Sequence, residues 1–309
     1  MENRSPLLSV VVVTYNHKKY IKSCLDSILK QKTTFEFEII VADDNSRDET
    51  VEYVEQLYGS LVVIINREKN IGLCANMYDA YTKARGKYIF DCSGDDYLPV
   101  DDVLQKHIDF LEEHPDFFSV ANWYEYYNVN KGEKRTIKIR YGEYCFNDFL
   151  KGVPVEFYLG TMRNTFLKDS PTFLCNASHN NEEIQMLYYT LSKGKKKILP
   201  EVLYTYCYRE RNDTSNYCST RNDRDVLEDY AKGFRAIEKV DKGKNRFNIA
   251  KMKYYEKYFD KIVDKENVRG IYTICKTIGI KDFLNFLAIK LAMRLRRKKS
   301  VLENNKMYK

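Results

Sequence analysis

The chain has 309 residues, 44% of them hydrophobic, and its mean hydropathy of −0.55 is typical of a soluble globular protein. Its eight cysteines are scattered and form no C-x-x-C pair, which argues against a zinc site and a disulfide framework. The net charge is +7, and residues 281–309 alone carry nine basic and two acidic residues. Residues 1–280 are therefore neutral overall, and no nucleic-acid partner is expected.

Neither a membrane span nor a secretion signal is evident in the sequence. No apolar run reaches the length of about 18 residues that a spanning helix needs. The segment Met1–Pro6 lacks the basic and then apolar profile of a signal peptide. We therefore expect a cytoplasmic protein.

Strands and helices are expected to alternate through the first third of the chain. β-branched and other apolar runs predict strands over residues 7–13, 37–41, 61–65 and 88–92. Caps and helical spacing predict helices from a cap at Asn16 to Ile28, from a capping box at 46–49 to Leu57, over 73–84, and from Pro99 to Leu111. This alternation predicts an α/β fold with a doubly wound, mostly parallel sheet flanked by helices.

Beyond Phe117 the alternation gives way to aromatic-rich, less regular sequence, which suggests mixed strands and a region facing an acceptor. From Asn222 onward the sequence is mostly helical. We therefore expect one domain over residues 1–220, with two halves at 1–120 and 121–220. A helical C-terminal region is expected over 221–309.

Two acidic pairs follow two of the expected strands, Asp43-Asp44 after the second and Asp95-Asp96 after the fourth. Ligands of open α/β sheets bind beyond the carboxyl ends of the strands. Carboxylates there accept hydrogen bonds from a nucleotide or hold a hard cation against its diphosphate. The pattern indicates an enzyme that handles a nucleotide-activated substrate.

Four motifs occur in an order and spacing that one known family shares. They are the segments 10–16, 41–50, 70–76 and 86–99. The chain thereby resembles the family 2 glycosyltransferases, which are inverting enzymes with the GT-A fold. The resemblance is firm over 7–120 and weaker over 150–215, and it says little about the rest of the chain. It implies that residues 1–220 are a catalytic domain, with a nucleotide-sugar-binding half at 1–120 and an acceptor half at 121–220.

The resemblance implies a nucleotide site after the first strand. Tyr15 would stack on a pyrimidine, and the Asp44 carboxylate would accept the N3–H of uracil, since an ionised carboxylate only accepts. The alternatives are packing of Tyr15 on the first helix and turn chemistry for Asp43 and Asp44. The donor-contacting residues expected from the family pattern are Thr14, Tyr15, Asp44, Asn76, Ser93, Asp96, Arg209 and Arg211.

The family usually carries a D-x-D motif whose last Asp binds Mg²⁺ or Mn²⁺ on the donor diphosphate. Here the matching triplet is Ser93-Gly94-Asp95, so Asp95 keeps the metal position and Ser93 replaces the first acidic residue. Ser93 can still bind a ribose or a metal-bound water, and Asp96 can help to orient Asp95 without binding the metal itself. The alternative is a solvated turn.

Inverting transfer needs a general base for the acceptor hydroxyl. The family has a carboxylate at the start of a helix that ends in a Lys-Gly turn, and Glu183 stands at that distance before Lys193-Gly194, with Glu182 as its neighbouring alternative. Arg209 and Arg211 belong to a segment resembling the family's Tyr-Arg-x-His, with Arg211 in place of His. They would meet the diphosphate; the alternative is surface charge.

Residues 283–295 form an expected amphipathic helix in which Leu284, Leu287 and Leu291 share a face, and it runs into the basic run 296–299. Such a helix can lie on an anionic membrane surface. The alternative is a helix that packs on the rest of the protein with a solvated charged end. Acceptors in the family are often lipid-linked, which favours the membrane.

The sequence therefore predicts a metal-dependent inverting glycosyltransferase. It would move a sugar from a nucleotide-diphosphate donor, UDP-linked for preference, to a saccharide or lipid-linked saccharide of a surface polysaccharide or glycoconjugate. It would act in the cytoplasm, or peripherally on the inner face of the cell membrane. One alternative is a nucleotidyltransferase, but residues 14–18 lack the Gly-rich loop expected of that class. A second is a non-catalytic protein that binds nucleotide-sugar or acts as a scaffold, which the replacement of the first D-x-D aspartate by Ser93 favours.

Overall fold

The structure is a computed structural model that describes residues 5–153, 160–169, 174, 179–209, 222–241, 243 and 246–292. Within its helices, the side chains of residues 167, 179–183, 257, 260 and 263–269 are not described. The chain divides into two compact units. The first comprises Met1–Phe146 and Val155–Arg221, and the second comprises Asn147–Pro154 and Asn222–Lys309.

The first unit contains all nine strands of the described sheet. They are β1 (Leu8–Thr14), β2 (Phe37–Asp43), β3 (Val63–Asn66), β4 (Tyr88–Ser93), β5 (Phe117–Asn128), β6 (Glu133–Ile137), β7 (Gly142–Tyr144), β8 (Thr161–Arg163) and β9 (Lys195–Tyr208). Its helices are α1 (Ile21–Leu29), α2 (Thr50–Tyr58), α3 (Leu73–Lys83), α4 (Val103–Glu113), α6 (Phe166–Asp169) and α7 (His179–Lys193). The short α5 (Phe146–Leu150) begins where the two units divide.

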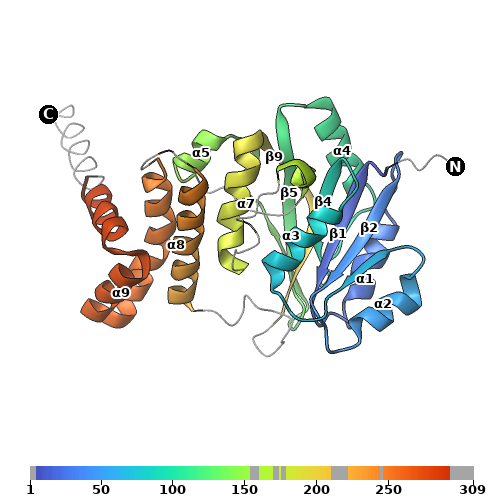
Figure 1. Cartoon of the computed structure of the whole chain (residues 1–309), viewed down its shortest axis with the longest axis horizontal. Coiled ribbons are helices and arrows are strands. Elements are labelled where there is room, and N and C mark those ends of the chain that lie inside the picture. The colour runs from blue at the N-terminus through green and yellow to red at the C-terminus, as the bar shows by residue number, and fades with distance from the viewer. Residues whose placement is uncertain are drawn as a thin grey trace. The chain divides into compact units, whose positions relative to one another are not determined.

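The strand order of the sheet is β3-β2-β1-β4-β8-β5-β9-β7, and β6 pairs with β5 beside this path. Figure 1 shows β2, β1 and β4 of this sheet side by side. The first four strands in this order run parallel, whereas β8 is antiparallel to both β4 and β5. β5 and β9 are parallel to each other. The predicted α/β fold is confirmed, including the change to mixed strands after Phe117.

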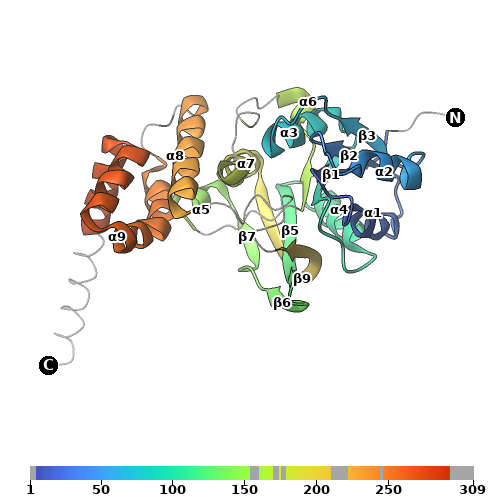
Figure 2. The same ribbon diagram turned by 90° about the horizontal axis from the view of Figure 1, so that it is seen from below.

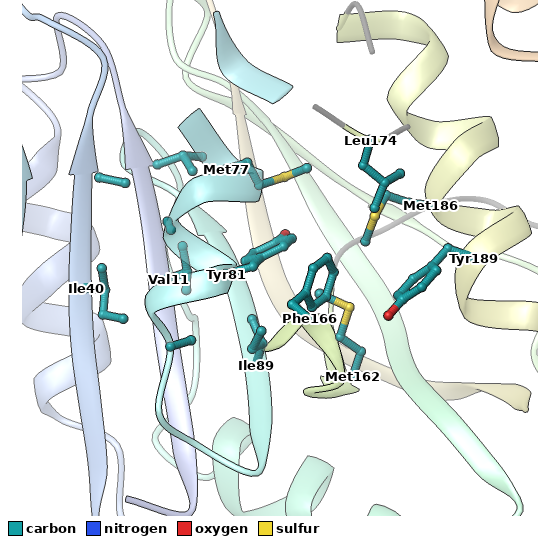
Figure 3. Close-up of a cluster of buried hydrophobic side chains, with 14 of the residues drawn as sticks. Val11, Ile40, Met77, Tyr81, Ile89, Met162, Phe166, Leu174, Met186 and Tyr189 are labelled. Atoms are coloured by element: carbon teal, nitrogen blue, oxygen red, sulfur yellow. The ribbon is translucent and has the colours of Figure 1, made fainter. Parts of the chain in front are cut away.

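Helices cover both faces of this sheet (Figure 2). On one face α3, α6 and α7 bury a cluster in which Tyr81, Phe166 and Tyr189 meet side chains of β1, β2 and β4 (Figure 3). On the other face α1 and α4 pack on the sheet, where the sulfurs of Cys24 and Cys92 are 3.7 Å apart. With both faces covered, β1 is buried throughout its length, which explains its unbroken apolar sequence.

Two expected helix starts are wrong, and for a related reason. Asn16 is not a cap: it has φ of 58°, its side chain accepts the backbone N–H of Arg47, and α1 begins at Ile21. The Ser46–Glu49 segment is not a capping box, because the Ser46 hydroxyl accepts the backbone N–H of Asn16 and α2 begins at Thr50. Asn16 and Ser46 are residue types that often cap helices, but here they form hydrogen bonds between the loop after β1 and the loop after β2.

The second unit is helical. Its main helices are α8 (Asp223–Val240), which begins with a capping box between Asn222 and Asp225, and α9 (Asn248–Ile278). Residues 280–292 form a further helix. Within the described residues, no helix combines the length and hydropathy that crossing a bilayer requires.

Candidate active site

The carboxyl end of β1 brings the two acidic segments together. β1 lies between β2 and β4 in the sheet, and Thr14 is in register with Asp43 while Val13 is in register with Ser93. The hydrogen bonds continue past the strands, because the Thr14 carbonyl accepts the N–H of Asp44 at 3.0 Å. Both acidic loops therefore leave the sheet at one edge, on either side of the same strand.

Gly94 lets the acidic loop after β4 lie close against the end of β1 and the start of α1. A Cβ atom at this position would lie 2.9 Å from the Ile21 side chain, 3.0 Å from His17 and 3.1 Å from Thr14. Thr14 is itself buried, and its hydroxyl has no hydrogen-bond partner among the described residues. A larger residue at 94 would require the Ile21 side chain, His17 or Thr14 to shift.

The Asp44 carboxylate is buried and holds the loop that leads into α3. One of its oxygens accepts the N–H of Ile71 at 2.7 Å, and the other accepts the N–H of Gly72 at 2.9 Å. Each oxygen keeps a second lone pair, which is what a base N–H would need. Tyr15 is half-buried next to this strand end. Base recognition by Tyr15 and Asp44 stays a prediction.

Asp43 has the turn role that the sequence offered as its alternative. Its two carboxylate oxygens accept the backbone N–H and the hydroxyl of Ser46, at 2.7 and 2.5 Å. Burial raises the pKa of this carboxyl, against the effect of the Ser46 hydrogen bonds.

Asn76 on α3 is buried and bonded at both ends of its amide. Its Nδ2 donates to the Ala42 carbonyl at 2.8 Å, and its Oδ1 accepts from Arg67 Nε at 3.0 Å. Arg67 in turn pairs with Asp79 at 2.5 Å. Asn76 thus joins α3 to the end of β2, and its expected contact with a donor stays a prediction.

Asp95 and Asp96 point to different environments although they are adjacent. The Asp96 carboxylate is buried and accepts from the Tyr204 hydroxyl and from the Cys207 N–H, each at 2.7 Å. Burial raises its pKa well above the ordinary value, and the neighbouring Asp95 charge adds to this. Asp96 therefore fastens the acidic loop to β9.

The Asp95 side chain, 13% exposed, is held by side chains rather than by backbone donors. Its Oδ1 accepts from the Ser93 hydroxyl, and its Oδ2 pairs with Arg209 at 2.7 Å. The Arg209 guanidinium also donates to the Asp95 carbonyl at 3.2 Å and lies 3.6 Å from the centre of the Tyr20 ring. Arg209 is buried, so it is a fixed positive charge at the sheet edge.

These side chains fit one type of metal site. In the described part of the chain no group of three or more His, Cys, Asp or Glu residues could enclose a metal. Asp95 and Ser93 nevertheless offer adjacent oxygen atoms that hard cations prefer, and Mg²⁺ usually binds one or two carboxylates together with substrate phosphates and water. The residues fit a cation that arrives with a diphosphate.

Two expected site residues lie outside the described side chains. Glu183 is on α7, but neither its side chain nor that of Glu182 is described, and Arg211 lies outside the described residues. The sequence also missed Tyr20 and Tyr204, which contact Arg209 and Asp96. The tyrosines that alternate along β9 indicate only a strand. Nothing in the sequence therefore singled out Tyr204 as a partner of Asp96.

Comparison with known proteins identifies the family of this chain. A model described as glycosyl transferase family 2 matches residues 9–173. An uncharacterized protein of Mycobacterium tuberculosis, Rv1520, is 38% identical over 112 residues, covering 35% of this chain and 32% of that protein. The glucosyltransferase WfaP of Escherichia coli, named for UDP-Glc, is 32% identical over 118 residues, covering 38% of this chain and 46% of that protein.

Two solved structures share the fold over nearly the whole chain. S. aureus TarS 1-349, in complex with UDP-GlcNAc, has a TM-score of 0.65 at 19% identity and covers 93% of this chain and 91% of that chain. The mannosyltransferase PcManGT from Pyrobaculum calidifontis, with GDP-Man and Mn²⁺, has a TM-score of 0.54 at 14% identity and covers 97% and 81%. By contrast, this chain spans about a third of the length of the first curated relatives it matches.

Proposed function

Because the chain belongs to glycosyl transferase family 2, we propose that it is an inverting transferase that uses a nucleotide-sugar donor, with a preference for UDP-sugars. One observation carries the proposal: Asp95 lies at the carboxyl edge of the sheet, in the acidic loop after β4 and next to the buried Arg209, and the acidic loop after β2 leaves the sheet on the other side of β1. An oxygen ligand beside a fixed cation suits a diphosphate, whose oxygens bind both a metal and a guanidinium.

The preference for uridine rests on two kinds of support. WfaP and the TarS complex are both named with a UDP-sugar, whereas PcManGT is named with GDP-Man. The Asp44 carboxylate is the feature of this chain that favours a base with an N–H edge. Uracil and guanine both present one, so guanosine is the competing base.

The roles of the site residues follow from their contacts. Asp95 would hold Mg²⁺ or Mn²⁺, with Ser93 orienting its carboxylate. When bound, the metal would act as a Lewis acid that stabilises the charge developing on the leaving diphosphate. Arg209 adds a preorganised positive charge there, and Asp96 keeps the loop in place through β9.

The acceptor side of the reaction requires a base. We propose Glu183, on α7, as the carboxylate that takes the proton of the acceptor hydroxyl while that oxygen attacks the anomeric carbon from the side opposite the diphosphate. The acceptor would be a saccharide or a lipid-linked saccharide in polysaccharide or glycoconjugate synthesis. We also expect the protein to work in the cytoplasm or at the inner face of the cell membrane.

Nucleotide binding tests the donor and the metal together. We would measure thermal stabilisation by UDP, GDP, CDP and dTDP, with and without Mn²⁺, in the wild type, in Asp95→Asn and in the surface control Asp109→Asn. UDP should raise the melting temperature most, the rise should need Mn²⁺, and only Asp95→Asn should lose it. Thermal stabilisation that is the same without Mn²⁺ and in Asp95→Asn would refute the metal site. Equal stabilisation by all four nucleotides would refute the uridine preference.

Turnover separates catalysis from mere binding. With a UDP-sugar and saccharide acceptors, the wild type should release UDP and form a product whose anomeric configuration is inverted, as followed by NMR. Glu183→Gln should bind UDP normally but lose at least about 100-fold in rate, since a general base typically contributes that much. Normal nucleotide binding without any turnover would favour the non-catalytic alternative, and retention of configuration would refute the inverting mechanism.

A further inference from the structure

The helix over 280–292 is anchored in the second unit by one of its faces. Gly279, with φ of 89°, ends α9 and lets the chain turn into this helix. Phe286 is buried and packs on Phe259 of α9, with ring centres 4.8 Å apart. The buried Lys251 of α9 pairs with Asp282 at 2.9 Å. An aromatic contact and an ion pair therefore orient the helix, and this orientation determines which of its side chains face outward.

The outward face of the same helix is apolar. Ile280, Leu284, Leu287 and Leu291 are exposed by 70%, 58%, 39% and 60%, and they follow one another at intervals of four, three and four residues. This spacing places them in one line along the helix, here named the apolar stripe. Single exposed leucines are ordinary, but a continuous row marks a surface for interaction.

The charge of the sequence that contains and follows the stripe favours one kind of occupant. Residues 281–309 hold nine basic and two acidic residues, and five of the basic ones lie at 294 and 296–299, directly after the stripe in sequence. One of the two acidic residues, Asp282, is already paired with Lys251. A second copy of this chain would bring the same positive charge against itself, whereas an anionic lipid surface complements both the charge and the apolar row.

We propose that the apolar stripe is a docking surface for an anionic lipid leaflet, and that the basic residues that follow it in the sequence add electrostatic attraction to that leaflet. The leucines would enter the boundary between headgroups and acyl chains, and the basic side chains would meet the lipid phosphates. The proposal rests on the proposed function only in that a lipid-linked acceptor would be found at such a surface. Docking itself needs neither the donor nor the sheet edge.

Vesicle flotation of the full chain tests this surface. The vesicles would be equal parts phosphatidylglycerol and phosphatidylcholine, or phosphatidylcholine alone. The variants are Leu284→Asp with Leu291→Asp, and a control with Leu57→Asp and Leu61→Asp, two leucines of the first unit that are 44% and 57% exposed. A third variant changes residues 296–299 to Gln. Far-UV circular dichroism would verify folding, and Leu284→Gln with Leu291→Gln serves as a milder substitute.

The wild type and the control should float with the anionic vesicles, and binding should weaken with added salt. The stripe variant and the Gln variant should each bind about tenfold or more weakly, and neutral vesicles should bind little. Equal flotation of wild type and stripe variant would overturn the proposal. So would a stripe variant that changes only the oligomeric state by light scattering, which would assign the stripe to a second copy. Thermal stabilisation by nucleotides, measured without vesicles, should be the same in all variants, so a failure of docking is distinguishable from a failure of the proposed function.

Discussion

The loops after β2 and β4 flank the same strand and each carries two aspartates, yet they hold their carboxylates differently. In the β2 loop, Asp43 and Asp44 both accept backbone N–H groups, from Ser46 and from Ile71 and Gly72. In the β4 loop, the donors to the Asp95 carboxylate among the described residues are two side chains, Ser93 and Arg209. Backbone donors cannot move without the chain, whereas side chains can rotate.

The comparison shows which carboxylates build the site and which one is available to a ligand. Asp43, Asp44 and Asp96 are matched by donors that belong to turns or strands, so they keep the edge rigid. Asp95 is held by the side chains of Ser93 and Arg209, and it is the carboxylate of these loops that we propose as the ligand of a cation. The difference predicts that substitutions will affect stability or activity according to the donors that each carboxylate has.

The largest effect is expected at a third β4 carboxylate, Asp91, which is buried and accepts from the Tyr81 hydroxyl. Burial raises its pKa from 3.8 to about 7. Between these values the folded protein keeps a proton that the unfolded chain releases, so stability falls as pH rises from about 4 to about 7. At about 1.4 kcal/mol for each pKa unit, the loss amounts to a few kcal/mol above neutral pH.

Asn at position 91 cannot ionise, so Asp91→Asn should remove the fall in stability that the wild type shows as the pH rises. Urea denaturation at pH 5 and pH 8 would measure it: the wild type should be clearly less stable at pH 8, and the variant should differ less between the two. The same pH slope in both proteins would contradict the assignment.

A somewhat smaller effect is expected at Arg209. Arg209→Gln should reduce kcat/KM for the UDP-sugar by about 100-fold, because it removes a preorganised charge at the diphosphate and the partner of Asp95. Arg209→Lys should restore part of the loss. Arg85→Gln, which breaks a surface pair with Glu38, is the matched control. Steady-state kinetics would test this, and an unchanged kcat/KM in Arg209→Gln would remove Arg209 from the donor site.

Asp96→Ala tests the inward-facing member of the β4 pair. It leaves the Tyr204 hydroxyl and the Cys207 N–H without their acceptor in a buried place, at a cost of about 2 kcal/mol in unfolding free energy. Urea denaturation would measure the cost. A loss below about 0.5 kcal/mol would show that Asp96 does not fasten the loop to β9.

The smallest effect is expected at Asp43. Asp43→Asn keeps an oxygen for the Ser46 N–H and removes a charge that burial disfavours, so it should cost less than about 1 kcal/mol. Asp44→Asn should cost more, since its amide would face one of two backbone N–H groups. The two variants compared in one urea series decide the point, and the reverse order would contradict the comparison.

Much of the fold could be predicted from the sequence, because apolar runs and helical spacing are local properties. The helix over 73–84 and the strand over 88–92 are observed as α3 and β4, nearly residue for residue. The starts of α1 and α2 could not be predicted. Asn16 and Ser46 have the composition of caps, but they bond to each other's loops, which only the approach of β1 and β2 makes possible.

The family, the α/β class and the position of the acidic pairs at strand ends were determined by the sequence alone, since each depends on the order of residues along the chain. Only the tertiary structure decided that Asp96 turns inward and Asp95 toward Arg209, because Tyr204 of β9 and Arg209, which follows β9, lie more than a hundred residues away along the chain. It also decided which face of the helix over 280–292 is buried. The sequence has apolar residues on both faces, and only packing of Phe286 on α9 leaves the leucines outside.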